Sequence, residues 1–526
     1  MSNLKKLPAG VVVLAMSLFF SCATGVQRDF TPARSLLDEQ ISPNERATLV
    51  DGLEEDSPYL KAHMLNGEVY VLSDQNIDTD GRTIRGSGLQ LGVNRDTLNQ
   101  GYFTISLDSV AIFETNSRIM SAPVAAMAVV TGASLALTAY CIINPKACFG
   151  SCPTFYVSDG QSLTLQAEGF SSSIAPSLEA RDIDALFLAQ PEGSIVDVEM
   201  RNEALETHVV RYVNLLLAPK LEHGRVMVDT DDAFWHVPTL HEPRACLAGD
   251  EDCLSAVRAL DGLERFTAAD STDLATREYI DLEFAVPSEG HLGLVIGARQ
   301  TLLTTYLLYQ TLAYMGRDVG EWFALLERHD QSLLGTGLGD ILGNIEVLVQ
   351  DGDGAWRVVG EVGEHGPLAT DVHLVHLPAL PSEAVRVRLR LTRGNWRLDY
   401  VALAEVGDPV DPVRLRPSVV LQDGVVSDRA LMLLEDDTEV LITFPGDLYT
   451  LRYELPSDAH EYELFLESRG YYLEWIRADW LKEENPQRLA QIMFNTDSAL
   501  RDLAPEFKSV EAQMEDIFWR SRYANQ

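Results

Sequence analysis

Residues 279–284 read YIDLEF, in which the side chains at 280, 282 and 284 are apolar and those at 281 and 283 are acidic. Successive side chains of a β-strand point to opposite faces, so this alternation predicts a strand with one buried and one solvated face. A Pro-Ser-Glu-Gly turn follows at residues 287–290. The apolar run LGLVIGA at residues 292–298 then predicts the next strand.

This pattern continues downstream and predicts a β-sandwich over residues 276–405. The further predicted strands are residues 345–350, 356–361, 371–377, 385–391 and 396–404. Between the two groups of strands, the apolar run from Gln300 to Leu326 has helical spacing and no turn before Met315-Gly316. It predicts one or two helices inserted into the sandwich, over residues 300–328.

The end of the predicted sandwich carries the stretch RGNWRLDYVAL at residues 393–403. This stretch resembles the closing strand of galactose-binding-like jelly rolls, in which ligand loops gather at one end. The resemblance implies a ligand site that includes Trp356, Trp396 and Asp399, with the acidic turn at residues 229–236 as a further candidate. That turn has no HExxH or other ligand spacing, so it predicts a turn beside Trp235 and no metal site.

Residues 406–526 are predicted to form strands followed by a helical C-terminal clamp. The predicted strands are residues 430–434, 439–444, 448–455 and 462–468. The predicted helices are residues 475–484, 486–494 and 506–522. Aromatic residues recur through these helices at helical spacing, which is typical of a face that packs onto a core.

Two closely spaced cysteine pairs mark residues 148–275: Cys148 with Cys152, and Cys246 with Cys253. In an oxidising compartment such pairs indicate disulfides, whereas a zinc site would need four ligands. Residues 148–169 begin with CFGSCP and end with Glu-Gly, and they resemble a widespread bacterial domain of unknown function. With a helix predicted over residues 177–186, the region is interpreted as α/β.

Residues 117–147 form an apolar segment that has two interpretations. Residues 122–143 contain no charge and are long enough to span a bilayer as a helix. Small and polar residues interrupt the run, including Pro123 and Gly132, which favours a buried helical hairpin instead. A span here would also place the later cysteines on the other side of the membrane.

Residues 59–116 are predicted to form a small β-barrel of about five strands. Asn66-Gly67 and Asp80-Gly81 are strong signals for two-residue hairpin turns. The order of strands and turns resembles SH3-like and Sm-like barrels. The resemblance implies an adaptor module.

The N-terminus has the features of an export signal. Lys5 and Lys6 precede an apolar run from Val11 to Phe20, which is followed by Ser21-Cys22. This end resembles the lipobox of bacterial lipoproteins, which implies cleavage after residue 21 and acylation of Cys22; ordinary cleavage a few residues later is the alternative. Residues 22–58 are rich in acids, Pro and Ser and are interpreted as a tether.

The formal net charge is −38, and it becomes −40 (−38 − 2) once the two lysines of residues 1–21 are removed. This charge repels nucleic acid, so the expected partners are a membrane reached through the lipid, envelope proteins or a neutral glycan. No GxSxG, phosphate-loop, GxGxxG or HExxH motif is present. The sequence therefore predicts no cofactor and no catalytic residue, and it lends no support to enzymatic activity.

Together these features predict a multi-domain α+β protein that is mainly antiparallel β. The predicted function is that of a non-catalytic binding or scaffolding lipoprotein, anchored at the bacterial cell envelope on the outer membrane or the periplasmic face. One alternative is a surface protein that binds or hydrolyses carbohydrate. The other is an integral membrane protein that spans the bilayer through residues 122–143.

Overall fold

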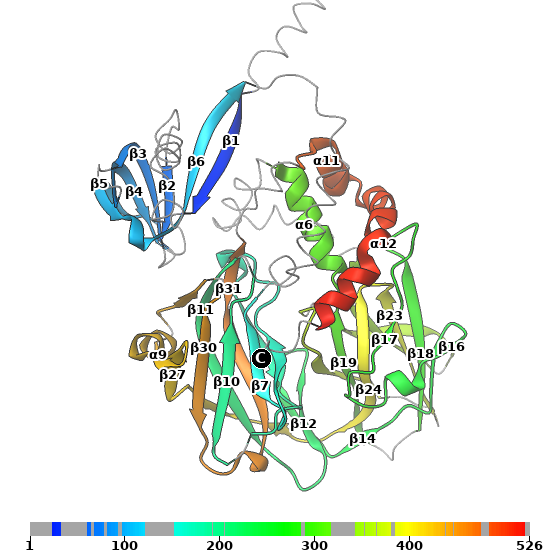
Figure 1. The fold of residues 1–526 in the computed structure, drawn as a ribbon. Coiled ribbons are helices and arrows are strands. Elements are labelled where there is room, and N and C mark those ends of the chain that lie inside the picture. The colour runs from blue at the N-terminus through cyan, green and yellow to red at the C-terminus, as the bar shows by residue number, and fades with distance from the viewer. Residues whose placement is uncertain are drawn as a thin grey trace, which may run out of the picture. The chain divides into compact units, whose positions relative to one another are not determined.

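The computed structural model describes residues 24–32, 60–120 and 152–520, with breaks at residues 65–67, 78–81, 93–96, 192, 205, 286–289, 317–341, 352, 364–365, 380–383, 437, 445 and 475–482. The chain divides into a smaller unit built from the N-terminal residues and a larger unit that holds most of the rest (Figure 1). Both units are mainly antiparallel β, as predicted.

The N-terminal unit is one six-stranded antiparallel sheet, called sheet A. Its strands, in spatial order, are β1 (Thr24–Pro32), β6 (Val110–Met120), β2 (Leu60–Met64), β3 (Val69–Ile77), β4 (Thr83–Leu91) and β5 (Thr97–Ser106). Among the described pairings none joins β1 to β5, so the sheet is a half-barrel rather than a closed barrel. Strand β1 lies within the predicted tether and pairs with β6 along its whole length, so residues 24–32 belong to the sheet instead.

The larger unit contains two β-sandwiches. Two sheets, B and C, pack face to face in the first sandwich around a core that includes Phe155, Val198, Leu215, Leu451 and Leu466. Sheet B consists of β28 (Val425–Val426), β27 (Val419–Gln422), β30 (Leu448–Glu454), β10 (Ile195–Arg201), β7 (Thr154–Ser158) and β8 (Leu163–Glu168). Sheet C consists of β26 (Val413–Leu415), β11 (Glu206–Pro219), β31 (Tyr462–Glu474), β9 (Ala180–Ala185) and β29 (Leu441–Thr443).

The second sandwich contains the YIDLEF stretch. Sheet D consists of β14 (Thr239–His241), β24 (Trp396–Val406), β19 (His291–Gln300), β22 (Asp371–His376), β12 (Arg225–Asp229), β13 (Phe234–Val237), β25 (Pro409–Val410) and β17 (Arg265–Phe266). Sheet E consists of β16 (Glu251–Asp252), β15 (Ala245–Ala248), β18 (Arg277–Ala285), β23 (Ala384–Thr392), β20 (Ile345–Gln350) and β21 (Trp356–Val362). Ile280, Leu282 and Phe284 of β18 are buried between the two sheets, as the alternation predicts.

The second sandwich is inserted into the first. Residues 225–410 supply all of its strands, and they leave sheet C after β11 and return to it at β26. This arrangement differs from the predicted boundaries at residues 275 and 405. The described part of residues 148–275 is also β with short 3-10 turns rather than α/β.

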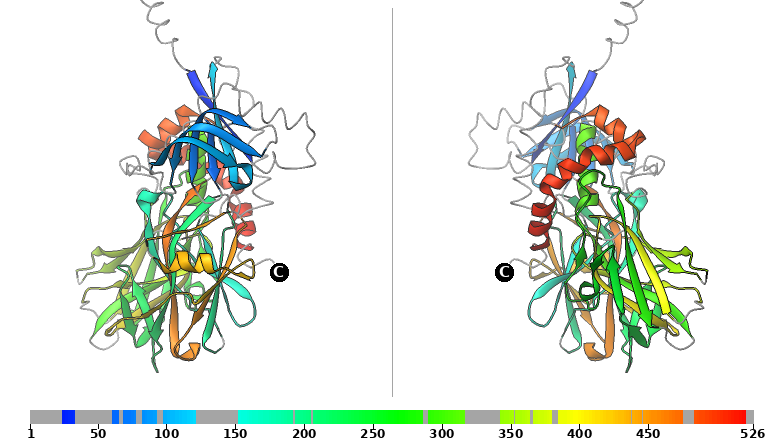
Figure 2. Two further views of the ribbon diagram at one scale, coloured as in Figure 1. Left: turned by 90° about the vertical axis from the view of Figure 1, so that its left-hand side faces the viewer. Right: turned by 90° about the vertical axis from the view of Figure 1, so that its right-hand side faces the viewer.

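Two short segments have a different secondary structure from the predicted one. The helix predicted over residues 177–186 is a 3-10 turn at Pro176–Leu178 followed by strand β9, because β9 pairs with β31 from Ala180 to Ala185. The strand predicted at residues 430–434 lies within helix α9 (Asp428–Glu435), whose first turn is capped by the Ser427 side chain. Helix α9, yellow in Figure 2, packs on the first sandwich through Ala430 and Leu434. Tertiary contacts outweigh weak local propensities in both cases.

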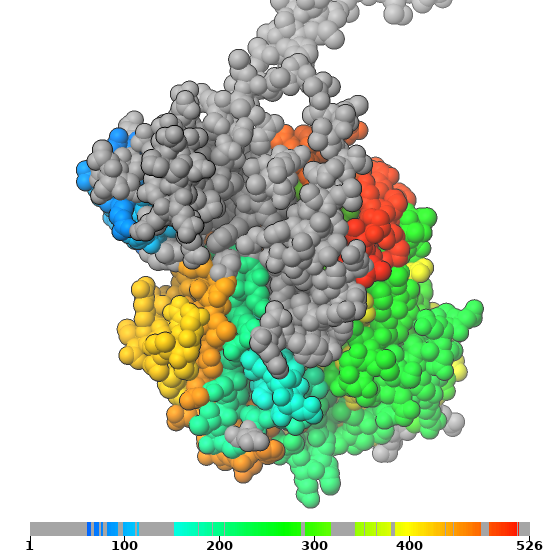
Figure 3. All heavy atoms as spheres, in the orientation of Figure 1, coloured from blue at the N-terminus to red at the C-terminus, as the bar shows by residue number. Residues whose placement is uncertain are grey.

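Three helices form a separate apolar cluster beside the second sandwich. They are α6 (Leu303–Met315), α11 (Pro486–Phe494) and α12 (Thr496–Arg520). Leu307 of α6 and Leu500 and Phe507 of α12 are buried together with Ala269 and Leu274 of the sandwich. Figure 3 shows the red C-terminal helix lying along the green surface of this sandwich, which agrees with the predicted clamp.

Several predicted features lie outside the described residues, namely the signal peptide, Cys22, Cys148, the apolar segment at 122–143 and the helix at 475–484. In the part of the chain that is described, no helix has the length and apolarity needed to cross a bilayer.

Candidate functional site on the outer face of sheet E

The predicted ligand residue Trp396 is a core residue. It is the first residue of β24, only 1% of it is exposed, and it packs among the side chains buried between sheets D and E. A ring buried this deeply offers no face to a ligand. This corrects the interpretation of Trp396 as a binding residue.

The predicted ligand residue Asp399 is also buried and has a structural role. Its carboxylate accepts hydrogen bonds from the backbone N–H of Gly262 at 3.0 and 3.1 Å and of Asp261 at 3.4 Å. Burial raises the pKa of Asp399 to about 6, although the backbone donors oppose that rise. Asp399 therefore fixes the turn at residues 261–262 onto sheet D and leaves no carboxylate oxygen directed at a ligand.

Trp356 has a different environment, because it lies on the outer face of sheet E. It is the first residue of β21 and is half-buried. The guanidinium carbon of Arg388 lies 4.3 Å from the centre of its ring and 5.2 Å from the ring centre of Tyr279. One arginine on β23 thus contacts an aromatic ring from β18 and another from β21.

Strand pairing brings these side chains to one face. Leu247, Asp281, Arg388, Leu348 and Val358 are consecutive cross-strand partners and form a row across five strands. Tyr279 lies to one side of this row and Trp356 to the other, through the pairs Tyr279–Arg390 and Gln350–Trp356. We call the face formed by Leu247, Tyr279, Trp356, Val358 and Arg388 the sheet E platform.

The apolar members of the platform are unusually exposed for their size. Leu247 and Tyr279 are each 46% exposed, and Val358 is 50% exposed. Leu247 and Tyr279 lie on neighbouring strands at one end of the row, and Val358 and Trp356 lie on β21 at the other end. Single exposed apolar residues are common on protein surfaces, but several on one sheet face indicate an interaction surface.

The charges on this face cancel locally. The Arg388 guanidinium donates to both carboxylate oxygens of Asp281, at 2.5 and 2.8 Å, and this pairing raises the pKa of Arg388. Arg386 pairs with Glu283 at 3.6 Å, and Arg390 pairs with Glu346. The three arginines of β23 and their three acidic partners therefore carry no net charge between them, on a strongly acidic chain.

The two predicted cysteine pairs differ in the structure. Cys246 and Cys253 form the predicted disulfide, which closes the short hairpin of β15 and β16 at the edge of sheet E. Cys152 is a free, buried thiol. Its predicted partner Cys148 lies outside the described residues, so that disulfide stays a prediction. The Cys152 Sγ lies 3.9 Å from a carboxylate oxygen of Glu168, and burial followed by repulsion from Glu168 raises the pKa of this thiol.

The acidic turn at residues 229–236 lies on sheet D and not at the platform. Asp229 Oδ2 accepts from Trp235 Nε1 at 2.7 Å and lies 3.0 Å from His376 Nε2, while Oδ1 accepts two backbone N–H groups. Burial alone would raise the pKa of Asp229, but these hydrogen bonds lower it. Within the described residues no group of acids, histidines or cysteines is arranged to hold a metal ion.

Of the predicted site residues, the structure therefore leaves only Trp356 on an accessible face. The sequence did not predict that Tyr279 and Arg388 lie on the same face as Trp356. The alternation in YIDLEF did indicate that Tyr279 faces away from the core. Its proximity to Trp356 depends on the order of strands in sheet E, which no local pattern encodes.

Comparisons with known proteins leave the family open. No protein-family model matches the chain, and no curated protein matches it. Among solved structures, a GH31 alpha-xylosidase from Xanthomonas citri aligns with 81% of this chain and 39% of its own, at 10% identity and a TM-score of 0.16. The chain thus spans about two fifths of that enzyme's length, and a TM-score this low does not establish a common fold.

Proposed function

We propose that this chain is an exported, lipid-anchored protein of the bacterial cell envelope that binds a neutral glycan through the sheet E platform. The observation that carries the proposal is the placement of Arg388 between the rings of Tyr279 and Trp356 on a charge-balanced sheet face.

The chemistry of a sugar ring matches this face. A pyranose has an apolar face of C–H groups, which stacks on aromatic rings, and a rim of hydroxyls, which both donate and accept hydrogen bonds. Tyr279 and Trp356 supply the rings, while Arg388 supplies donors and Asp281 supplies acceptors between them. A strand face is also flat enough to follow an extended chain of sugars.

Charge favours a neutral ligand over an anionic one. The chain has a formal charge of −38, whereas the platform's own charges are paired. Binding should therefore depend little on salt, because no net charge is neutralised when the complex forms.

Binding without hydrolysis fits the platform better than catalysis. Glycoside hydrolysis requires two carboxyl groups placed on either side of the scissile bond. Asp281, Glu283 and Glu346 are each held by an arginine of the same face. These pairs leave the three carboxylates on one flat face as hydrogen-bond acceptors, with no second carboxyl group among the described residues placed across a bound sugar from them.

Trp356→Ala is expected to weaken binding to a neutral polysaccharide at least tenfold, about 1.4 kcal/mol, because one of the two aromatic rings beside Arg388 is lost. Affinity electrophoresis through gels that contain a panel of neutral polysaccharides measures the effect. Tyr102→Ala is the matched control, since Tyr102 is a 67% exposed tyrosine of sheet A. Equal retardation of the Trp356→Ala variant and the wild type would contradict the platform.

The membrane anchor has a separate test. If Cys22 carries the lipid, Cys22→Ala should move most of the protein from the membrane fraction to the soluble fraction, because the acyl chains supply the membrane affinity. Fractionation of cells that express each form, followed by carbonate extraction, gives the readout. A Cys22→Ala protein that resists carbonate would instead support a membrane span through residues 122–143.

A further inference from the structure

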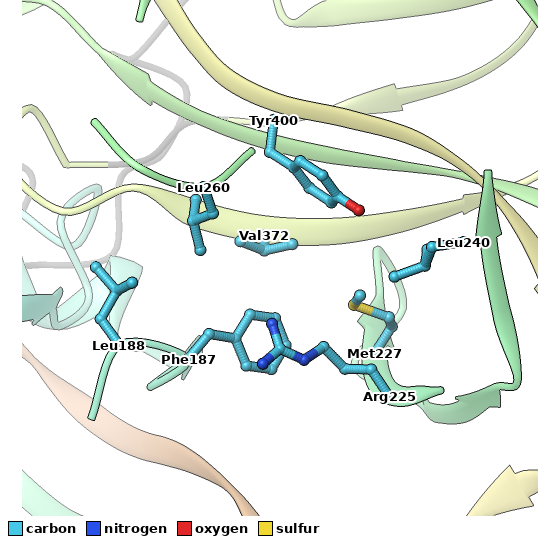
Figure 4. Close-up of a pocket in the computed structure, with 8 residues that line it drawn as sticks. All are labelled: Phe187, Leu188, Arg225, Met227, Leu240, Leu260, Val372 and Tyr400. Atoms are coloured by element: carbon cyan, nitrogen blue, oxygen red, sulfur yellow. The ribbon is translucent and has the colours of Figure 1, made fainter. Parts of the chain in front are cut away.

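A second site lies on the opposite side of the same sandwich, on the face of sheet D that points away from sheet E. A pocket of about 350 Å³ opens there (Figure 4). At roughly 30 Å³ per molecule of liquid water, this is room for about a dozen waters or one small organic molecule. Phe187 and Leu188, which follow β9, line one wall, so the pocket is built from both sandwiches.

Most of the lining is apolar. Met227, Leu240, Leu260 and Val372 project from sheet D and its loops, and Leu188 at the rim is 50% exposed. Gly297 on β19 lets Tyr400 of β24 lie close against the neighbouring strand, because a Cβ at position 297 would lie 3.0 Å from the Cβ of Tyr400. A ligand with an apolar body can therefore be enclosed against the sheet.

Two polar groups interrupt this lining, Arg225 and Tyr400. The guanidinium of Arg225 lies 4.1 Å from the ring centre of Phe187, and its Nε lies 3.4 Å from Glu463 (Figure 4). In the part of the chain that the structure describes, the Nη atoms of Arg225 and the hydroxyl of Tyr400 have no hydrogen-bond partner. Burial raises the pKa of Tyr400; the positive charge of Arg225 opposes that rise, and the negative charge of Glu242 adds to it.

Both groups can donate hydrogen bonds, and one of them is a cation. Together they match an oxygen acceptor with negative charge, and a guanidinium binds a carboxylate through two parallel N–H groups. Repulsion from acidic groups farther than about 8–10 Å is screened at physiological salt. The nearby Glu463 engages Arg225 through Nε, which leaves both Nη atoms for a ligand.

We propose that this pocket binds a small amphipathic carboxylate, with its apolar body against Met227, Leu260 and Val372 and its carboxylate on Arg225 and Tyr400. The site is independent of the sheet E platform, which lies on the other sheet of the sandwich and takes a neutral ligand.

The test uses 4-phenylbutyrate and its neutral analogue 4-phenylbutanol as probes, with binding followed by calorimetry on the purified protein. We expect the carboxylate to bind at least tenfold more tightly than the alcohol. Arg225→Gln should remove that preference, and Tyr400→Phe should weaken carboxylate binding severalfold. Arg386→Gln, at a 57% exposed arginine of sheet E that is also paired with a glutamate, should leave binding unchanged.

Thermal melts of each variant establish that it is folded before its affinity is compared. Equal affinity for the acid and the alcohol, an Arg225→Gln variant that still binds the acid like the wild type, or no binding of the acid at millimolar concentration would each overturn the proposal. None of these results bears on glycan binding at the platform.

Discussion

Trp396→Ala is expected to lower the free energy of unfolding by about 3–5 kcal/mol, the range typical of removing a large aromatic side chain from a core. Trp396 is 1% exposed and packs between the two sheets of the second sandwich with Leu398, Leu391 and Val387. The cavity left by the indole would be lined by apolar side chains that backbone pairing holds in place, so little of it can close. Urea denaturation followed by circular dichroism measures the loss.

The same measurement separates a core residue from a ligand residue. Trp356→Ala, on the outer face of sheet E, should change stability by about 1 kcal/mol or less and glycan binding by at least tenfold. Trp396→Ala, assayed on folded protein below its melting temperature, should bind glycan like the wild type. If Trp396→Ala left stability intact and abolished binding, the assignment of Trp396 to the core would be wrong.

The second large effect concerns pH. Four acidic side chains and one histidine gather where β8, β9 and β22 meet; they are Glu168, Asp182, Asp184, Asp371 and His373. Burial, followed by repulsion from Asp371, raises the pKa of Asp182 from 3.8 to about 7. Burial and repulsion from Asp182 also raise the pKa of Asp184. A carboxylate oxygen of Asp371 lies 2.5 Å from the ring of His373. Burial lowers the pKa of this imidazole, but the negative charge of Asp371 outweighs burial and raises it.

All three shifts act in the same direction. A group whose pKa is higher in the folded protein binds more protons when folded, so its stabilising contribution is present in acid and is lost as the pH rises through the folded pKa. For Asp182 the loss extends from about pH 4 to about pH 7. The carboxylate of Asp229 has a lowered pKa, and its opposite contribution changes only in more acidic solution.

We therefore expect the free energy of unfolding to fall by about 2 kcal/mol between pH 5 and pH 8, because at 1.36 kcal/mol per pKa unit the contribution of Asp182 changes by at most about 2.7 kcal/mol between pH 5 and pH 7. Asp184→Asn should raise stability at pH 8 and flatten the dependence, because it removes a buried charge from the cluster. Asp250→Asn, at an exposed turn, is the control. Melting temperatures that rise from pH 5 to pH 8 would contradict this account of the cluster.

Local patterns in the sequence predicted much of the secondary structure. The alternation in YIDLEF gave β18 with the correct buried face, and the apolar run after Gln300 gave α6 over Leu303–Met315. The helix predicted at Pro486–Phe494 is confirmed as α11, where Pro486 occupies the first turn and Asn485 caps it. In each case the signal lies within a few residues of the element that it specifies.

The arrangement of the strands could not be predicted in the same way. Strand β11 pairs with β31, from Glu206 with Glu474 to Pro219 with Tyr462, across the whole inserted sandwich. Strand β9 depends on the same partner, so its residues resemble a helix when they are considered alone. Nothing near these segments specifies which distant edge they join.

The residues of the candidate site could not be predicted from local patterns either. Trp356 and Trp396 each begin a strand and are each followed two residues later by an apolar side chain, Val358 or Leu398. One tryptophan is on the surface and the other is in the core, because Trp396 points between sheets D and E whereas Trp356 points away from sheet D on the outer face of sheet E. The face to which each side chain points in the assembled sandwich, rather than the pattern along the strand, decides which ring can meet a ligand.

A glycan array probed at low and high salt with the purified protein and with a Trp356→Ala, Tyr279→Ala double variant tests the proposed function most directly. We expect the wild type to bind neutral glycans with little dependence on salt, and the double variant to lose those signals while keeping its melting temperature within a few degrees. Binding that survives in the double variant, or binding confined to acidic glycans, would contradict the account.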